Sequence, residues 1–379
     1  MKELKFNGYK ILIGPGSIDQ IQEIEGKRIF IVTGKASMFK NGTIDHLEKL
    51  LNAQHKSYEI YSGIGGNPTS TEVLAGLKKM KAFVPDVVLA VGGGSAIDAA
   101  KVMTLLCEYQ TVTLDDIKAG KGPSIRKRIT LIAAPSTSGT ASEVTRAAVI
   151  TFEEEHIKVG LKTTAFIPDI AILDGNLTLS MPQNVMAETG MDALTHAIEG
   201  YINQNNDDFS KVMSKGSVEG LCQYLPLSFE KGDLESRQKV HHYQCLAGMA
   251  FQNSGLGMDH GIAHAFGGRF LISHGLLNAV ALPYVLKYNA RDKKVRADLE
   301  ELSRMIGEDI IAKVEAFNTQ FGMPKTFQAI GILEADFKKY YDCLVDDSLK
   351  GSTIKNPISM NQEAMDKVLR SIYYGDILF

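Results

Sequence analysis

Short apolar runs alternate with amphipathic stretches from Arg28 to about Asp174. The runs have the length and β-branched content of strands, and the stretches between them repeat apolar residues at helical spacing. In order, they are RIFIVT, a helical stretch near Thr43 to Ala53, KSYEIYS, a helical stretch near Ser70 to Ala82, and DVVLAVGGGS. Strand–helix–strand alternation of this kind predicts a parallel sheet covered by helices.

Strand signals nearly vanish beyond Pro182. Before that point, further strands are predicted at ITLIAAPST, AAVITF, HIKVGL and DIAILD. After it, helical patterns follow one another, in AETGMDALTHAIEGYIN, DDFSKVMSKGSVEGLCQYL, RQKVHHYQCLAGMAFQNSG and on through Lys287 and Ile311 to the tail. A chain of 379 residues exceeds what one hydrophobic core usually serves. We therefore predict a Rossmann-like α/β domain over residues 1–180 and an all-helical domain over residues 181–379.

Charge and cysteine content exclude several classes of protein. The net charge is −3 without a long basic run, which argues against nucleic-acid binding. The first apolar run, Ile11 to Ile13, is too brief for a signal peptide or a membrane span, so we expect a soluble cytoplasmic protein. Four cysteines without a C-x-x-C pair argue against a zinc knuckle or a disulfide framework, and we expect them to be buried thiols.

A glycine-rich turn follows the buried strand Val87 to Val91. Gly93, Gly94 and Ser95 lie at this turn, immediately before a helical segment. Such a strand-to-helix turn exposes backbone N–H groups and the positive end of a helix dipole to phosphate. The turn is not the G-x-G-x-x-G fingerprint, and glycines can also merely relieve steric crowding in a tight turn.

A second loop, PSTSGTASE from Pro135 to Glu143, follows the strand ITLIAA. It presents hydroxyls and small residues at the carboxyl edge of the same predicted sheet, where open α/β sheets bind ligands. The alternative is a polar connecting loop without a ligand. Together the two loops favour a nucleotide site.

Histidines and one carboxylate suggest a metal site in the helical half. Asp192 and His196 are four residues apart and point from one helical face. His260, His264 and His274 fall within fifteen positions, far closer than nine histidines spread evenly along the chain would lie. Nitrogen and oxygen ligands without cysteine suit Fe(II), Zn(II), Co(II) or Mn(II). His196 alone could equally be a hydrogen-bonded helix histidine, and we interpret the remaining histidines as surface or structural: His46, His55, His156, His241 and His242.

Four motifs in register resemble the iron-containing (group III) alcohol dehydrogenases. They are GGGSAIDAAK, PSTSGTASEVT, GMDALTHAIEGY and GLGMDHGIAHAFGGRFLISHGLLNA. The likeness spans the chain, from GPGSIDQI to KNPISMNQEAM, and is nearest in texture to short-chain propanol, ethanol and butanol dehydrogenases. Asp259, before His260, departs from the small or apolar residue usual in the family.

The resemblance implies a dehydroquinate-synthase-like two-domain fold and assigns residues to sites. Asp192, His196, His260 and His274 correspond to the metal ligands, with Fe²⁺ usual and Zn²⁺ possible, and His264 to a histidine beside the substrate. Around the cofactor it places Asn67, Gly94, Ser95, Asp98, Thr137, Ser138, Thr140 and Lys158.

Cofactor preference is predicted from a missing carboxylate. Many NAD-preferring members carry an acidic residue after the strand RIFIVT, where this chain has Gly34 and Lys35. A carboxylate there would bind the ribose diol and repel a 2′-phosphate. We therefore predict that NADP(H) is favoured, with NAD(H) possible.

The resemblance implies a metal-dependent enzyme that moves a hydride between NAD(P)(H) and a short primary alcohol or aldehyde, and it implies a homodimer. Within the family, 4-hydroxybutyrate, lactaldehyde or a diol are alternative substrates. A dehydroquinate-synthase-like lyase, or a non-catalytic scaffold or filament subunit, are more distant alternatives.

Overall fold

The computed structural model describes residues 3–155 and 157–379, so His156, expected to be surface or structural, lies outside the described residues. It divides into two compact units. The first comprises Glu3–Pro182 and Gly232–Cys245, and the second comprises Gln183–Lys231 and Leu246–Phe379. The expected division into domains of residues 1–180 and 181–379 stays a prediction. The first unit also includes the beginning of helix α8 (Leu234–Ser254).

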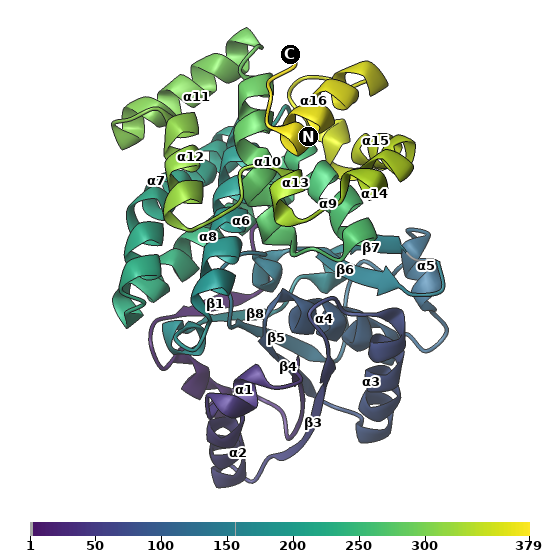
Figure 1. The fold of residues 1–379 in the computed structure, drawn as a ribbon. Helices are drawn as coiled ribbons and strands as arrows, with labels where there is room; N and C mark the ends of the chain where they lie inside the picture. Colours follow the sequence, from purple (N-terminus) through teal and green to yellow (C-terminus); the bar gives the residue numbers. More distant parts are fainter. Residues whose placement is uncertain (1–2, 156) are drawn as a thin grey trace. The chain divides into compact units, whose positions relative to one another are not determined.

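Six parallel strands form the sheet of the first unit, in the order β1-β8-β5-β4-β2-β3 (Figure 1). The strands Ala147–Phe152 and Ile157–Lys162 are not part of it, because they pair with each other as a separate antiparallel hairpin. The sheet strands are β1 (Lys10–Ile13), β2 (Arg28–Gly34), β3 (Ser57–Ile64), β4 (Val87–Gly92), β5 (Thr130–Pro135) and β8 (Ile170–Leu173), and the hairpin strands are β6 (Ala147–Phe152) and β7 (Ile157–Lys162).

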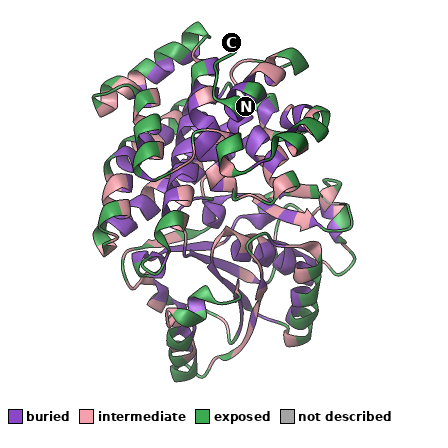
Figure 2. Ribbon diagram, viewed as in Figure 1, coloured by how far each residue is buried: buried purple, intermediate pink, exposed green. Residues whose placement is uncertain are grey.

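The strands of the sheet are largely buried (Figure 2), and alternation of their side chains builds one core on each face. On one face, Phe30 and Val32 pack with residues of α3 and α4. On the other face, Ile29 and Ile31 pack with residues of α2 and the 3₁₀ helix η1. Because both faces are covered, the central strand β4 is buried and apolar at every position, as its continuous run in the sequence predicts.

The helices of the first unit connect the strands. Helix α3 begins after a capping box, in which the Thr69 side chain accepts from the Glu72 backbone N–H. The helices are α1 (Ser37–Lys40), α2 (Thr43–Ala53), α3 (Ser70–Phe83), α4 (Gly94–Glu108) and α5 (Leu114–Lys118), and the 3₁₀ helices are η1 (Ser17–Gln22), η2 (Ser142–Val144), η3 (Thr164–Phe166) and η4 (Gly175–Thr178).

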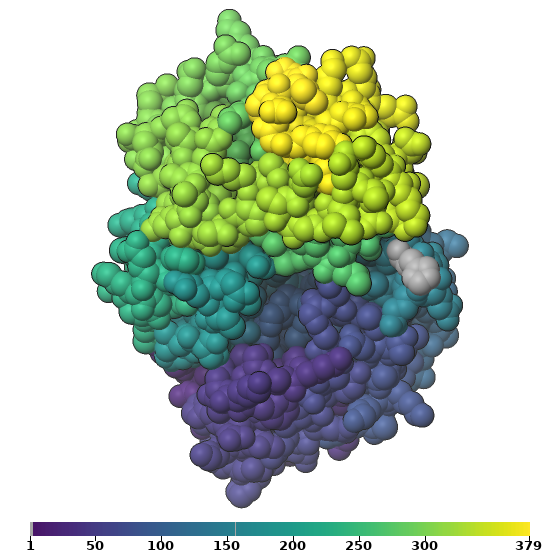
Figure 3. Space-filling model, viewed as in Figure 1, coloured from purple at the N-terminus to yellow at the C-terminus, as the bar shows by residue number. Residues whose placement is uncertain are grey.

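The described residues of the second unit form helices and the loops between them, and no strand, which confirms the predicted fold class. Its C-terminal residues lie at the surface in Figure 3, where they are yellow. No helix in the described ranges is long and apolar enough to cross a membrane. Besides the second half of α8, the helices are α6 (Gln183–Ile202), α7 (Asp208–Glu230), α9 (Met258–Phe270), α10 (His274–Asn289), α11 (Lys293–Ile306), α12 (Ile310–Gln320), α13 (Phe327–Ile330), α14 (Glu334–Lys339), α15 (Tyr341–Ser348), η5 (Gly351–Lys355) and α16 (Gln362–Tyr374).

The cysteines are only partly as expected. Cys107, Cys222 and Cys245 are buried free thiols, but Cys343 is exposed, so the expectation of burial is wrong for that residue. Its position on α15 explains the error, because that helix buries Leu344 and Val345 instead.

Candidate metal centre and dinucleotide loops

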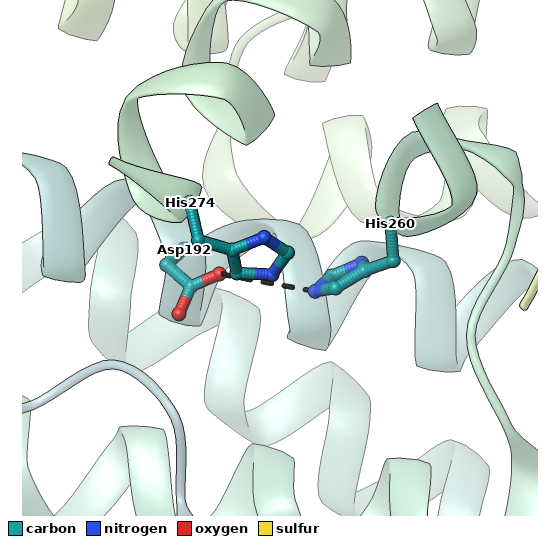
Figure 4. A group of neighbouring side chains, drawn as sticks. All are labelled: Asp192, His260 and His274. Atoms are coloured by element: carbon teal, nitrogen blue, oxygen red, sulfur yellow. Dashed lines mark ion pairs between the residues drawn. The ribbon is translucent and has the colours of Figure 1, made fainter. Parts of the chain in front are cut away.

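Three helices of the second unit bring Asp192, His260 and His274 together (Figure 4). Asp192 comes from α6, His260 from α9, and His274 is the first residue of α10. One ligand atom from each lies within 4.8 Å of the others. The Asp192 Oδ1 is 3.8 Å from Nε2 of His260 and 3.8 Å from Nε2 of His274. This is a compact group of one carboxylate and two imidazoles, and its donors suit a divalent transition metal.

A glycine sets how closely α10 approaches α6. A Cβ atom on Gly275 would lie 2.3 Å from the backbone oxygen of Glu188 and 3.4 Å from Cβ of Asp192. Only a residue without a side chain fits at this crossing. The close approach holds His274, the preceding residue, beside Asp192.

His196 lies next to this group but outside it. Its ring stacks on Phe251 with centroids 4.4 Å apart, and it lies 4.3 Å from the ring of His260. Its Nδ1 is 3.9 Å from Asp192 Oδ1. The structure thus groups three of the four expected ligands within 4.8 Å and places the fourth against them; ligation by His196 stays a prediction.

His264 also borders the group. It lies one helical turn after His260 on α9, and its ring stacks on that of His274, with centroids 4.8 Å apart and planes 17° apart. An imidazole in this position is close enough to the predicted ligands to exchange a proton with a molecule bound there, directly or through water.

Glu199 orients one of the expected ligands, His260, a role that was not predicted from the sequence. Nδ1 of His260 donates to Glu199 Oε2 over 2.7 Å, and the same carboxylate accepts from the backbone N–H groups of Gly257 and Asp259. With its proton on Nδ1, His260 keeps the Nε2 lone pair for a metal, the arrangement typical of histidine ligands. A signal existed, because Glu199 lies seven residues after Asp192 and so shares its helical face.

Burial sets the charges around His260. Desolvation lowers its pKa well below the usual value, and the neighbouring histidines lower it further, so the ring is neutral, as a ligand must be. Desolvation raises the pKa of Asp259, and the charges of Glu199 and Asp192 raise it again. Among the described residues no group donates to either oxygen of Asp259, so no hydrogen bond offsets the effect of burial on this carboxyl.

In the first unit, the two loops expected to bind the cofactor touch each other. Gly93 and Gly94 follow β4 and begin α4, and Ser95 Oγ donates to the Gly66 carbonyl over 2.6 Å. A Cβ on Gly94 would lie 2.6 Å from Oγ1 of Thr140. This glycine is therefore required by close approach of the second loop, in addition to any role toward phosphate.

Other expected cofactor residues have structural partners. Asp98 accepts from Ser142 Oγ and from the backbone N–H of Val149, which fastens α4 to the second loop and to β6. Ser138 Oγ lies 2.9 Å from Nδ1 of the buried His241. These contacts account for the polarity of both side chains within the fold, and their role toward a cofactor stays a prediction.

The remaining cofactor positions lie near the same edge of the sheet. Thr137 is near Gly93: a Cβ atom added to Gly93 would lie 3.7 Å from Cγ2 and 3.8 Å from Oγ1 of Thr137. Lys158 Nζ donates to Asn67 Oδ1 over 3.0 Å. Gly34 ends β2, at an irregularity of its pairing with β3.

The chain matches two family models in sequence. Residues 9–175 match "Iron-containing alcohol dehydrogenase", and residues 186–373 match "Fe-containing alcohol dehydrogenase family, C-terminal". It is 37% identical to the NADPH-dependent butanol dehydrogenase of Clostridium saccharobutylicum over 96% of each chain, and 33% identical to the 1-propanol dehydrogenase PduQ of Citrobacter freundii over 96% of this chain and 98% of that one. An iron-containing alcohol dehydrogenase structure from Thermococcus thioreducens is similar with a TM-score of 0.91, at 30% identity over 99% of this chain and 100% of that one.

Proposed function

Because this chain belongs to the iron-containing alcohol dehydrogenase family, we propose that it interconverts a short primary alcohol and its aldehyde, using NADP(H) and a ferrous ion held by Asp192, His260 and His274. Membership makes the chain an oxidoreductase acting on alcohols. The convergence of the three ligand atoms within 4.8 Å carries the proposal. Its relatives named for butanol and 1-propanol support a short primary alcohol.

The residues present fit a metal. Asp192 and His260 are buried, His260 is neutral with Nε2 free of its proton, and Glu199 fixes that tautomer. A divalent ion in such a site supplies Lewis acidity, which lowers the pKa of a bound alcohol and polarises an aldehyde. We propose that His196 adds a fourth ligand and the third nitrogen, because its Nδ1 lies 3.9 Å from Asp192 Oδ1.

The chain's own residues then handle the proton and the cofactor. His264, stacked on His274, accepts the hydroxyl proton through a ring nitrogen, directly or by way of water. A nicotinamide cofactor, when bound, would supply the redox chemistry by exchanging a hydride with the carbinol carbon. The glycine turn before α4 and the hydroxyls of Thr137 and Thr140 would hold the phosphates of that cofactor.

The metal proposal is tested by anaerobic reconstitution with ferrous salt and a panel of short alcohols and aldehydes, followed at the nicotinamide absorbance. We expect uptake of about one ion per chain and the highest kcat/KM on unbranched primary alcohols. 4-Hydroxybutyrate, lactaldehyde and diols belong in the panel, and a higher kcat/KM on one of these would replace the proposed substrate. Failure to bind any ion would refute the metal chemistry.

The role of His264 has its own test. His264→Ala should lower kcat by about a hundredfold, the scale of general acid–base catalysis, while leaving the metal content unchanged. Full activity in this variant would remove the residue from the mechanism.

Gly34 supports the preference for NADP(H). Its backbone is not in the left-handed region, and the nearest atom to an added Cβ is 3.8 Å away, so glycine there is not demanded by the fold. Lys35 supplies a positive charge beside it, although Nζ lies 3.2 Å from Glu72. The relative from Clostridium saccharobutylicum is named as NADPH-dependent.

Gly34→Asp tests this directly. A carboxylate there should lower kcat/KM for NADPH by about tenfold or more relative to NADH, through repulsion of the 2′-phosphate. Gly34→Ala is the matched control and should leave the ratio nearly unchanged. A wild-type preference for NADH of about tenfold would contradict the proposal.

We also propose a cytoplasmic homodimer that pairs through β1. This strand is an edge of the sheet; its last residue, Ile13, is 62% exposed, and Tyr9, the residue before the strand, is 83% exposed. An exposed apolar edge strand invites pairing. Light scattering of Ile13→Lys should detect monomers if this edge is the interface.

A further inference from the structure

Asn278 lies at the centre of the proposed ligands. It is fully buried on α10, one turn after His274. Its Nδ2 is 2.7 Å from Asp192 Oδ1, 3.3 Å from His260 Nε2 and 3.2 Å from His274 Nε2. These are the three atoms that converge to form the candidate metal centre.

In this orientation, the hydrogen-bonding groups of the amide and those of its neighbours do not match. An NH₂ group has two hydrogens, so it cannot donate to three acceptors at once. At the other end of the amide, Oδ1 is buried and has no hydrogen-bond partner among the described residues. A buried carbonyl oxygen without a partner costs about 1–3 kcal/mol.

A half-turn about the Cβ–Cγ bond exchanges the two ends of the amide. The ends have nearly the same shape, and hydrogen bonding decides which of them faces a given group. A cation among the three ligand atoms reverses that choice, because it repels the NH₂ hydrogens and attracts the carbonyl oxygen. Rotation gives up the Nδ2 hydrogen bond to Asp192 Oδ1, whose lone pair an ion would take instead. It breaks no hydrogen bond of Oδ1 within the described residues, because Oδ1 makes none there.

The distances place the same end within reach of an ion. Transition metals bind nitrogen and oxygen ligands at about 2.0–2.2 Å. An atom 2.7–3.3 Å from three such ligands lies close to any ion that all three share. Amide oxygens are ligands for hard divalent cations.

We propose that Asn278 is a further metal ligand of this chain, binding through Oδ1. The inference rests on the proposed metal function, and it extends the ligand set beyond the carboxylate and histidines. With a fifth protein ligand the site departs from the four-coordinate geometry that Zn²⁺ prefers, so Asn278 favours Fe²⁺ over Zn²⁺.

The test compares wild type with Asn278→Leu and Asn278→Asp by anaerobic titration with Fe²⁺, Co²⁺ and Zn²⁺. Asn278→Leu keeps the shape without the oxygen, so the Fe²⁺ affinity should fall by about 10–100-fold and the Zn²⁺ affinity by less. The visible spectrum of the Co²⁺ form should intensify, because four-coordinate cobalt absorbs more strongly than five-coordinate cobalt.

Asn278→Asp separates a ligand from a hydrogen-bond donor. An aspartate keeps an oxygen at the site, so metal affinity should be retained. If Asn278 instead serves by donating to Asp192, a second carboxylate would repel Asp192, and the affinity would fall below that of Asn278→Leu, which would overturn the proposal.

Asn289→Ala is the matched control. Asn289 is buried on the same helix but hydrogen-bonds to Asn356, so its loss should affect stability and not the Co²⁺ spectrum. Equal metal affinities and equal Co²⁺ spectra for wild type and Asn278→Leu would refute ligation by Asn278 and leave the proposed metal function standing. A wild-type protein that takes up none of the three ions would refute the proposed metal function itself.

Discussion

Gly275→Ala should weaken metal binding although it replaces none of the proposed ligands. The added Cβ would lie 2.3 Å from the Glu188 backbone oxygen and 2.7 Å from its carbonyl carbon. Both atoms are backbone of α6, so no side chain can rotate away. Carbon and oxygen need about 3.3 Å, and α10 must therefore withdraw from α6 by about 1 Å.

That displacement acts on the metal centre directly. Gly275 follows His274, and Glu188 lies one turn before Asp192, so the helix shift separates these two ligands, now 3.8 Å apart. A shift of about 1 Å in a site of this kind costs roughly a hundredfold in activity. Overpacking should also lower the free energy of unfolding by about 1–3 kcal/mol.

The assay measures Fe²⁺ affinity by competition with a chelator, alongside urea unfolding. Gly216→Ala is the control, because an added Cβ there meets only the Leu246 side chain, at 3.7 Å, in the interior of α7. That variant should keep its metal affinity and gain up to about 1 kcal/mol of stability from helix propensity. Wild-type metal affinity in a folded Gly275→Ala protein would show that the crossing does not position His274.

Three further predictions concern single residues. In Glu199→Gln, the amide NH₂ group faces one of the three donors that the carboxylate now accepts from, and it favours the wrong tautomer of His260. The Fe²⁺ affinity should therefore fall by about 10–100-fold in a metal titration. An unchanged affinity would contradict the orienting role. Burial lowers the pKa of Lys101 from 10.5 to about 8. The buried ammonium therefore destabilises the folded state fully below pH 8, and this cost falls as the pH rises toward 10.5. The free energy of unfolding of wild type relative to Lys101→Met should therefore rise by about 2 kcal/mol between pH 7 and 9.5, and a flat difference would refute the shift. Leu271 has a left-handed φ of 55° and is 79% exposed, so Leu271→Gly should stabilise the protein by up to about 1 kcal/mol in urea unfolding, whereas a loss would mean that the side chain makes a stabilising contact.

Helical spacing predicts which side chains share a face of a helix, but it does not predict which of them belong to the metal centre. The four-residue separation of Asp192 and His196 correctly predicts one helical face, yet His196 lies outside the group within 4.8 Å. The same four-residue spacing applied to His274 points to Asn278, and a spacing of seven residues, which also keeps one helical face, leads from Asp192 to Glu199. Asparagine and glutamate are common on helices, so spacing alone gives no reason to select them.

The sequence by itself determined the two-part architecture, because apolar periodicity is a local property and survives without tertiary contacts. The runs at β2, β4 and β5 and the glycine turn after β4 could be read in this way. Tertiary structure alone decided that α6, α9 and α10 cross where they do, since Gly275 and Glu188 lie far apart in sequence. The orientation of His260 by Glu199 and the position of Asn278 among three ligand atoms depend on that crossing, because hydrogen bonds and metal ligation require distances that no pattern of residues specifies.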